Sequence, residues 1–361
     1  SQVDSCRLRI TLLTCSPGEE LYAAWGHTAI RVTDSMAGTD MVYNYGTFDD
    51  TDPLFLANFT KGLMRYSLSS YPFEEFVREY TFYKRGIIEQ DLDLECADKN
   101  RIYAALKQND RDENRFYNYY FHTDNCTSRA RDVLINNSNG PIVFKKIIPT
   151  PPPTYRNLIH QYLRDQQPWS QFGIDILLGA NLDKRVSNNQ AMFLPDYLLK
   201  ALDSATNQQH PMVSNKRTVL ATPLVEQTGF LKPWMLFLII AMIIAVLTIN
   251  KSGTSLRILS VFDRLFFLFL GLVGCLLATS WIIRIDDVCR NNLNILWALP
   301  THLVIAFMMY RKKEWVKRYF RFTFILSALL AVMWFFIPQE LNPAVAPILA
   351  ILMLRTWKLS K

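Results

Sequence analysis

The sequence predicts an α+β domain followed by an all-α bundle of about five transmembrane helices. Strand-like and helix-like segments are mixed in the first 229 residues, and five apolar runs follow from Phe230 onward. Of the 39 Lys and Arg residues, 15 lie from Phe230 onward, with 5 of the 32 acidic residues. This part therefore carries a formal charge of +10 and the first 229 residues −3. We expect one domain over residues 1–229 and a transmembrane domain over residues 230–361.

The length of the apolar runs predicts membrane spans. A spanning helix needs ~20 apolar residues, and the first two runs meet this length. The third contains Pro300 and His302, and the last two are short, so buried core helices are the alternative for these. The runs are 230–249, 265–283, 293–310, 322–337 and 343–354.

The charges between the runs decide the orientation. The third connection holds six basic residues over 311–321, whereas the loops 284–292 and 338–342 hold few. Basic loops lie on the cytoplasmic side of a membrane. The C-terminus is then cytoplasmic, and the N-terminal domain lies in the periplasm of a multi-pass inner-membrane protein. The basic excess thus favours a membrane partner and not nucleic acid. The other basic positions of this pattern are Lys251, Arg257 and Arg264 in the first connection and Arg355, Lys358 and Lys361 in the tail.

The N-terminal domain is predicted as an antiparallel sheet with helices. Alternating residues indicate strands over 7–15, 27–33 and 41–45, and the last two are joined by a polar turn. A longer strand or strand pair is expected over 83–94. Helices are predicted over 73–80, 99–109, 127–136 and 154–165.

The cysteines suit an oxidising compartment. The chain begins at Ser1 and not at Met, as expected after removal of a signal peptide. The six Cys have no metal-ligand spacing, so no metal or other cofactor is expected. Cys6, Cys96 and Cys289 are the candidates for a disulfide, and the sequence leaves their pairing open.

Cys126 is the candidate nucleophile because it begins a predicted helix. Thr123 or Asp124 is expected to cap that helix. The positive end of the helix dipole favours a thiolate, and the Cys126 backbone N–H is free to hold an oxyanion. The alternative is a buried Cys that fills a helix–sheet contact. Cys15 is the rival nucleophile, but Pro17 and Gly18 prevent a helix from starting after it.

His27 and Asn44 are the candidate partners of the thiol. A Cys nucleophile needs an imidazole, and His27 follows Gly26 at the start of a strand. Asn44 on the next strand is placed to orient that imidazole. The alternatives are a structural strand-end His and a turn Asn, and His122 is a rival base.

The order of these residues resembles permuted papain-like thiol enzymes, including NlpC-type peptidases and lecithin:retinol acyltransferases. The chain is more similar, over nearly its whole length, to the Lnb-type lipoprotein N-acyltransferases of Bacteroidota. The motifs that carry this are LLTCSPGEELYAAWGHTAIRV (12–32), VYNYGTF (42–48), DNCTSRARDVL (124–134), TYRNLI (154–159), GIDILLG (173–179) and NNLNILWALP (291–300). The family pattern has a His near the position where this chain has Asp287. This difference speaks against a direct catalytic role for the loop.

The resemblance implies acyl transfer from a phospholipid to the α-amino group of a diacylglyceryl-cysteine lipoprotein. Cys126 would form a thioester with the help of His27, and both lipid substrates would stay in the bilayer. The alternatives are a membrane-tethered cysteine peptidase or amidase acting on cell-wall peptides, and a non-catalytic lipid-binding or assembly protein.

The outer loop and the start of the third run are the candidate substrate-binding region. Basic residues there can bind a lipid phosphate, and Asn beside an apolar run indicates a polar lining. Ordinary interfacial anchoring is the alternative for the two arginines. The residues concerned are Arg284, Arg290, Asn291, Asn292, Asn294 and Trp297.

Overall fold

A computed structural model describes residues 6–48, 54–222, 231–250, 252–311 and 313–361. The contacts divide the chain into two units, residues 1–162 with 185–226 and residues 163–184 with 227–361. The predicted boundary at 229/230 lies outside the described residues. Residues 163–184, which the sequence suggested were part of the N-terminal domain, belong by their contacts to the second unit.

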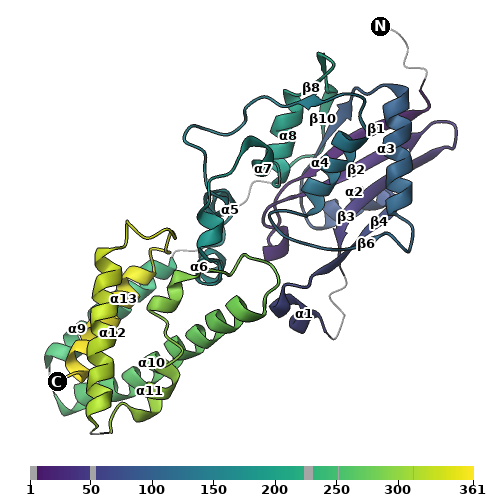
Figure 1. Cartoon of the computed structure of the whole chain (residues 1–361). Coiled ribbons are helices and arrows are strands. Elements are labelled where there is room, and N and C mark those ends of the chain that lie inside the picture. Colours follow the sequence, from purple (N-terminus) through teal and green to yellow (C-terminus); the bar gives the residue numbers. More distant parts are fainter. Residues whose placement is uncertain (1–5, 49–53, 223–230, 251, 312) are drawn as a thin grey trace. The chain divides into compact units, whose positions relative to one another are not determined.

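The first unit is built on an antiparallel sheet, as predicted (Figure 1). Its order is β10-β5-β1-β2-β3-β4-β6. The strands are β1 (Leu8–Cys15), β2 (His27–Asp34), β3 (Thr39–Thr47), β4 (Arg65–Pro72), β5 (Ile87–Leu92), β6 (Phe116–Asn118) and β10 (Val213–Leu220). A smaller sheet joins β7 (Ile142–Val143), β8 (Thr206–Asn207) and β9 (His210–Pro211).

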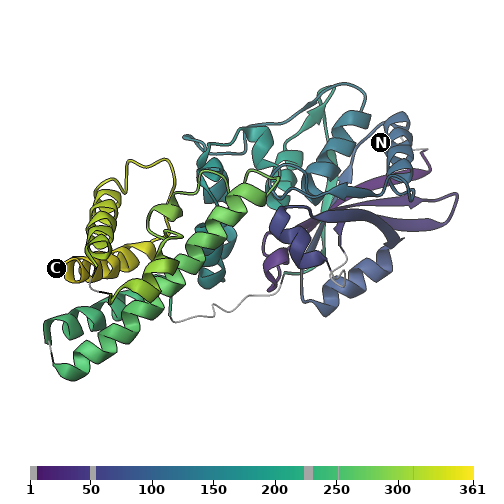
Figure 2. The same cartoon turned by 60° about the horizontal axis from the view of Figure 1, so that its bottom comes forward.

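Helices cover both faces of the large sheet (Figure 2). On one face α3, α4 and α8 contribute to the core, and on the other α2 packs against β3 and β4. The helices are α2 (Phe73–Phe82), α3 (Cys96–Asn109), α4 (Cys126–Asn137) and α8 (Pro195–Asp203), with η1 (Leu21–Ala23), α1 (Phe55–Lys61), α5 (Tyr155–Leu163) and α7 (Asn188–Ala191) beside them.

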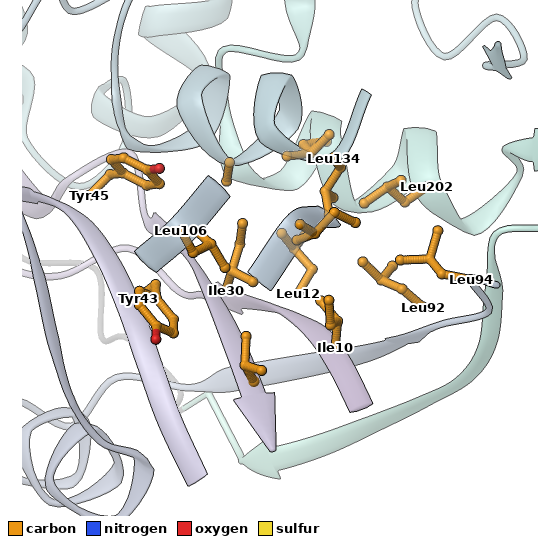
Figure 3. Close-up of a cluster of buried hydrophobic side chains, with 14 of the residues drawn as sticks. Ile10, Leu12, Ile30, Tyr43, Tyr45, Leu92, Leu94, Leu106, Leu134 and Leu202 are labelled. Atoms are coloured by element: carbon orange, nitrogen blue, oxygen red, sulfur yellow. The ribbon is translucent and has the colours of Figure 1, made fainter. Parts of the chain in front are cut away.

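The main core forms because strand side chains alternate between the faces. Ile10, Leu12 and Ile30 are fully buried and meet Leu106 of α3 and Leu134 of α4 (Figure 3). Leu13, Cys15 and Ala29 point to the opposite face, where they form a second core with Phe76 and Tyr80 of α2.

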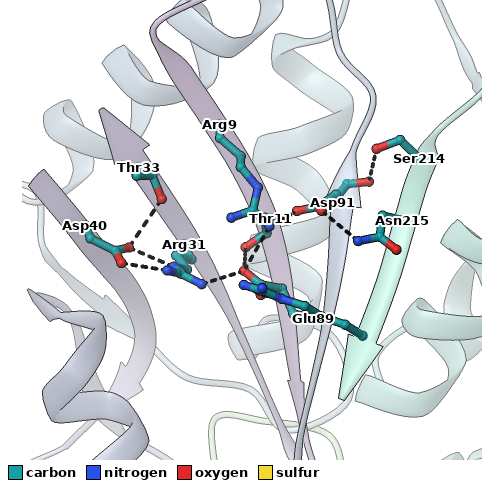
Figure 4. Close-up of polar contacts among 10 residues, drawn as sticks. Arg9, Thr11, Arg31, Thr33, Asp40, Glu89, Asp91, Ser214 and Asn215 are labelled. Atoms are coloured by element: carbon teal, nitrogen blue, oxygen red, sulfur yellow. Dashed lines mark hydrogen bonds and ion pairs between the residues drawn. The ribbon is translucent and has the colours of Figure 1, made fainter. Parts of the chain in front are cut away.

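A charged network crosses the α2 face of the sheet (Figure 4). Glu89 is buried and accepts hydrogen bonds from Thr11 at 2.7 Å, Arg31 at 2.9 Å and Arg217 at 2.7 Å. Burial alone would raise the pKa of Glu89, but the hydrogen bonds of Thr11 and Arg217 and the Arg31 charge lower it. Arg31 also binds Asp40, so this network ties β10, β5, β1, β2 and β3 together.

The second unit is helical. It contains α6 (Pro168–Leu177), η2 (Ala180–Asp183), α9 (Pro233–Asn250), α10 (Gly253–Ile283), η3 (Leu293–Leu296), α11 (His302–Met308), α12 (Glu314–Val332) and α13 (Val345–Leu359). Among the described residues, α9 and α10 are long and apolar enough to cross a membrane. The third predicted span is interrupted, because η3 is followed by Pro300 and by a seven-residue α11. A count of five spans stays a prediction.

Some of the basic residues assigned to loops lie inside helices, and that assignment was wrong. Arg257 and Arg264 belong to α10, which begins at Gly253. Arg355 belongs to α13, where it is buried and binds Asp263 of α10 at 2.7 Å and 2.8 Å. It also donates to Thr248 of α9 at 2.8 Å, so one cation links three helices. A hydropathy pattern places such charges outside the helices. Two opposite charges that pair inside a helical bundle are, however, compatible with a continuous helix.

A disulfide joins Cys6 to Cys96 across a sequence separation of 90 residues, and Cys289 has a free thiol. This bond attaches the chain before β1 to the start of α3. It also agrees with an oxidising compartment.

Removing the disulfide is expected to destabilise the first unit. The double variant Cys6→Ala/Cys96→Ala should lose about 2–4 kcal/mol of unfolding free energy, because the bond closes a long loop. Urea unfolding of the solubilised protein measures this loss. Wild-type protein treated with a reductant is the control and should match the variant, and a variant as stable as the oxidised protein would contradict the prediction.

Candidate active site

The candidate nucleophile begins a helix whose start is fixed by its neighbour. Asn125 caps α4 and accepts hydrogen bonds from the backbone N–H groups of Thr127 and Ser128, both at 2.9 Å. Asp124, predicted as a cap, instead forms an ion pair with Arg129 at 2.7 Å. The cap thus uses the second and third amides of the helix and not the Cys126 amide, which suits an oxyanion-binding role.

His27 and Asn44 lie beside this thiol, His27 at the start of β2 and Asn44 within the neighbouring β3. The His27 Nε2 atom lies 2.5 Å from the Asn44 Oδ1 atom, and the Asn44 Nδ2 atom donates to the Tyr71 hydroxyl at 2.9 Å. Since Nε2 is engaged, Nδ1 is the ring nitrogen left for the hydrogen bond with Cys126. The three residues predicted from the sequence therefore meet at one place.

Two glycines near the site have a positive φ. Gly46 has a φ of +96°, and a Cβ there would lie 3.4 Å from the Cys126 Cβ and 3.6 Å from the His27 Cε1. Gly26 has a φ of +82°, and a Cβ there would lie 2.7 Å from the Cys15 carbonyl oxygen. Both backbones are tolerated by glycine and strained for other residues.

The electrostatics favour a thiolate–imidazolium pair. Burial would raise the pKa of Cys126, but the His27 charge and hydrogen bond, with further hydrogen bonds from Thr28 and Thr127, lower it to about 7. Burial disfavours a charged His27, yet the Cys126 charge and hydrogen bond raise the pKa of that imidazole above its ordinary value. Each group thus stabilises the charged form of the other.

The rival residues have different surroundings. Cys15 is paired across the sheet with His27, but burial raises the pKa of its thiol to about 12. A buried neutral thiol is a poor nucleophile. His122 packs against Tyr155 with ring centroids 5.0 Å apart and is not among the residues that line the cavity beside Cys126.

A cavity of about 610 Å³ opens beside Cys126 and His27, the catalytic dyad candidate (below, the dyad). All the residues that line this cavity belong to the first unit. Cys126, His27 and Asn44 line it. Its walls are otherwise rich in aromatic side chains, which include Tyr22, Phe48, Tyr66, Tyr71, Tyr80, Phe82, Tyr83 and Tyr119. Such walls suit a ligand with a long apolar part.

Comparison with family models gives two matches. The Lnb N-terminal periplasmic domain matches residues 1–161, and the Lnb transmembrane domain matches residues 225–360. The chain belongs to the Lnb family. It is thus a membrane protein with a periplasmic N-terminal domain, and family membership indicates an enzyme of lipoprotein maturation. Comparisons with curated proteins and with solved structures gave no significant match.

The predicted substrate residues lie in the Lnb transmembrane domain, and three of them are buried there. Asn292 donates to the carbonyl oxygens of Ile176 at 2.7 Å and Leu177 at 2.9 Å. Asn294 donates to the Asp175 carbonyl oxygen at 3.0 Å and accepts from the Trp297 indole at 2.9 Å. These contacts are structural, because they attach η3 to the end of α6. A role in binding substrate stays a prediction.

The other three residues of that region differ in exposure. Arg284 is half-buried and binds Asp286 at 2.8 Å. Arg290 and Asn291 are exposed, and Asn291 has a φ of +55°. Their role in binding substrate also stays a prediction.

Arg85 is one of the cavity residues that the sequence analysis did not identify. It lies in the turn between α2 and β5, and its side chain lines the cavity with the dyad. No local signal marks Arg85, because the alternation over 83–94 predicts a strand there.

The pKa values predict how labelling of Cys126 depends on pH. Alkylation by iodoacetamide should rise through a midpoint near pH 7, because the thiolate forms above the lowered pKa of Cys126. In His27→Ala the midpoint should move to the ordinary thiol value of about 9 or higher, because burial then acts without the imidazolium. Rate measurements across pH test this. Asn44→Ala is the matched control, and an equal shift in both variants would contradict the assigned pair.

Proposed function

We propose that this Lnb protein is a lipoprotein N-acyltransferase that works through a thioester on Cys126. The observation that carries the proposal is the Cys126–His27–Asn44 arrangement in an aromatic cavity of a membrane-bound chain. Its geometry suggests a permuted papain-like thiol domain. The donor would be a phospholipid and the acceptor a diacylated lipoprotein.

The first step forms the acyl-enzyme. The Cys126 thiolate attacks the carbonyl carbon of a lipid ester, and the Cys126 backbone N–H stabilises the oxyanion. The carbon–oxygen bond of the ester breaks, and the His27 imidazolium gives its proton to the leaving alkoxide. The products are a thioester and a lysophospholipid.

The second step transfers the acyl chain. The α-amino group of the lipoprotein attacks the thioester, the carbon–sulfur bond breaks, and the thiolate leaves. His27 accepts the proton that the amine loses, which restores the imidazolium. Asn44 holds the ring in the orientation that both steps need.

A thiol suits transfer better than hydrolysis, because an amine attacks a thioester more readily than water does. Membrane attachment keeps the enzyme on the surface that holds both lipid substrates. Tyr22, Phe82 and Tyr83 line the cavity and are 62%, 79% and 56% exposed, as suits contact with lipid at a membrane interface.

An acyl-enzyme should be detectable without any acceptor. Incubation with phospholipid vesicles should add one acyl mass to the intact protein, and hydroxylamine should remove it. Cys126→Ser should lose the adduct and reduce transfer by at least about 10³-fold, because a Ser hydroxyl has no pKa that His27 matches. Cys15→Ser is the matched thiol control and should keep the adduct. An adduct that survives in Cys126→Ser and disappears in Cys15→Ser would assign the nucleophile to Cys15.

We further propose five membrane spans with a cytoplasmic C-terminus. A cysteine placed in the loop 284–292 should then react with an impermeant maleimide in whole cells, and one placed at 313–321 should not. The background is a chain in which the free cysteines Cys15, Cys126, Cys275 and Cys289 are replaced. Reaction at 313–321 together with protection of 284–292 would reverse the orientation.

A further inference from the structure

Arg85 is held in place by the turn that carries it. Its backbone N–H donates to the Tyr80 carbonyl at 2.8 Å. The next residue, Gly86, donates to the Ser16 hydroxyl at 2.8 Å and accepts from the Ser16 N–H at 2.9 Å. The position of the Arg85 side chain in the cavity is therefore set by the fold on both sides of the residue.

The guanidinium group is only partly satisfied. Its Nε atom donates to the Ser16 carbonyl at 2.9 Å, and the group lies 4.7 Å from the Tyr80 ring centre. Its Nη2 atom is buried and has no hydrogen-bond partner among the described residues. Arg85 forms no ion pair with a described carboxylate, although Glu19, Glu20 and Glu79 also line the cavity. A buried cationic donor without an anion is costly, which indicates that an anionic ligand completes it.

We propose that Arg85 binds the phosphate of the phospholipid donor while its ester lies at Cys126. This inference rests on the proposed function, which makes an ester lipid the ligand. Arg85 and the dyad line the same cavity, and in a phospholipid only glycerol carbons separate the phosphate from the ester groups. A planar guanidinium matches phosphate oxygens in a way that Lys does not.

The neighbours of Arg85 support a lipid-borne phosphate. Phe82 ends α2 and Tyr83 begins the turn, and both line the same cavity and are largely exposed. The turn thus presents two cationic groups, Lys84 and Arg85, beside apolar rings. An ester lipid offers this combination, with a phosphate near its acyl chains, and a free anion does not.

The test measures binding without acyl transfer. A diether phosphatidylglycerol has no ester for Cys126 to attack, and the matching diether glycerol lacks only the phosphoglycerol group. Each is titrated into detergent micelles of the full chain, and protection of Cys126 against iodoacetamide is measured. In the wild type the diether phospholipid should protect at a mole fraction at least about tenfold lower than the phosphate-free lipid.

Arg85→Gln should remove this preference and leave protection by the diether glycerol within about threefold of the wild type. Arg85→Lys should restore only part of it. Arg78→Gln is the matched control, because Arg78 is an exposed residue of α2 that does not line the cavity. It removes the same charge and should keep the preference. Iodoacetamide labelling without lipid shows that each variant keeps a folded site.

Three results would overturn the assignment. They are a wild type without the preference, an Arg85→Gln variant that keeps it, and protection by micromolar inorganic phosphate that depends on Arg85. The last would make Arg85 a site for free phosphate. Failure of the proposed function looks different, because protection by diether lipid would then persist while ester lipids give no acyl adduct.

Discussion

The side chain of Asn125 fixes the point from which the candidate chemistry starts. It accepts two hydrogen bonds from the first turn of α4 and donates to the carbonyl oxygens of Phe121 at 2.7 Å and Phe193 at 2.9 Å. Four hydrogen bonds thus join the helix, its approach and a distant segment at one buried amide. Cys126 is the next residue, so the distance between the thiol and the strand that carries His27 depends on this cap.

A comparison of the two buried thiols near His27 shows how the position of Cys126 at a helix start affects its pKa. Burial acts on both, yet the pKa of Cys15 is about 12 and that of Cys126 about 7. Cys15 ends a strand and has Tyr80 and Arg85 as its polar neighbours, whereas Cys126 begins a helix and bonds to the imidazole. Desolvation therefore acts to raise the pKa of both thiols, and the imidazolium and local hydrogen bonds decide which thiol ionises.

The sequence predicted the sheet strands around the site and the meeting of Cys126, His27 and Asn44, because period-two alternation and a helix start are local signals. It did not identify Asn125 as the cap, since several adjacent residues have suitable side chains. It also missed the role of Arg355, because a charge near the end of an apolar run looks like a loop. That role depends on Asp263, 92 positions away, which no local pattern reveals.

The helical unit contains a similar arrangement, in which side-chain amides form hydrogen bonds to one end of a helix. The last carbonyl groups of a helix lack partners within it, and in a membrane-associated unit water is a poor substitute. Asn292 and Asn294 supply donors to the carbonyls at the end of α6, and Gln339 donates to Leu178 at 3.1 Å. This explains why polar residues beside an apolar run are tolerated, and why residues 163–184 pack with the helices. The asparagines that looked like a substrate lining first serve to close a helix end, which leaves Arg290 and Asn291 as the exposed residues of that region.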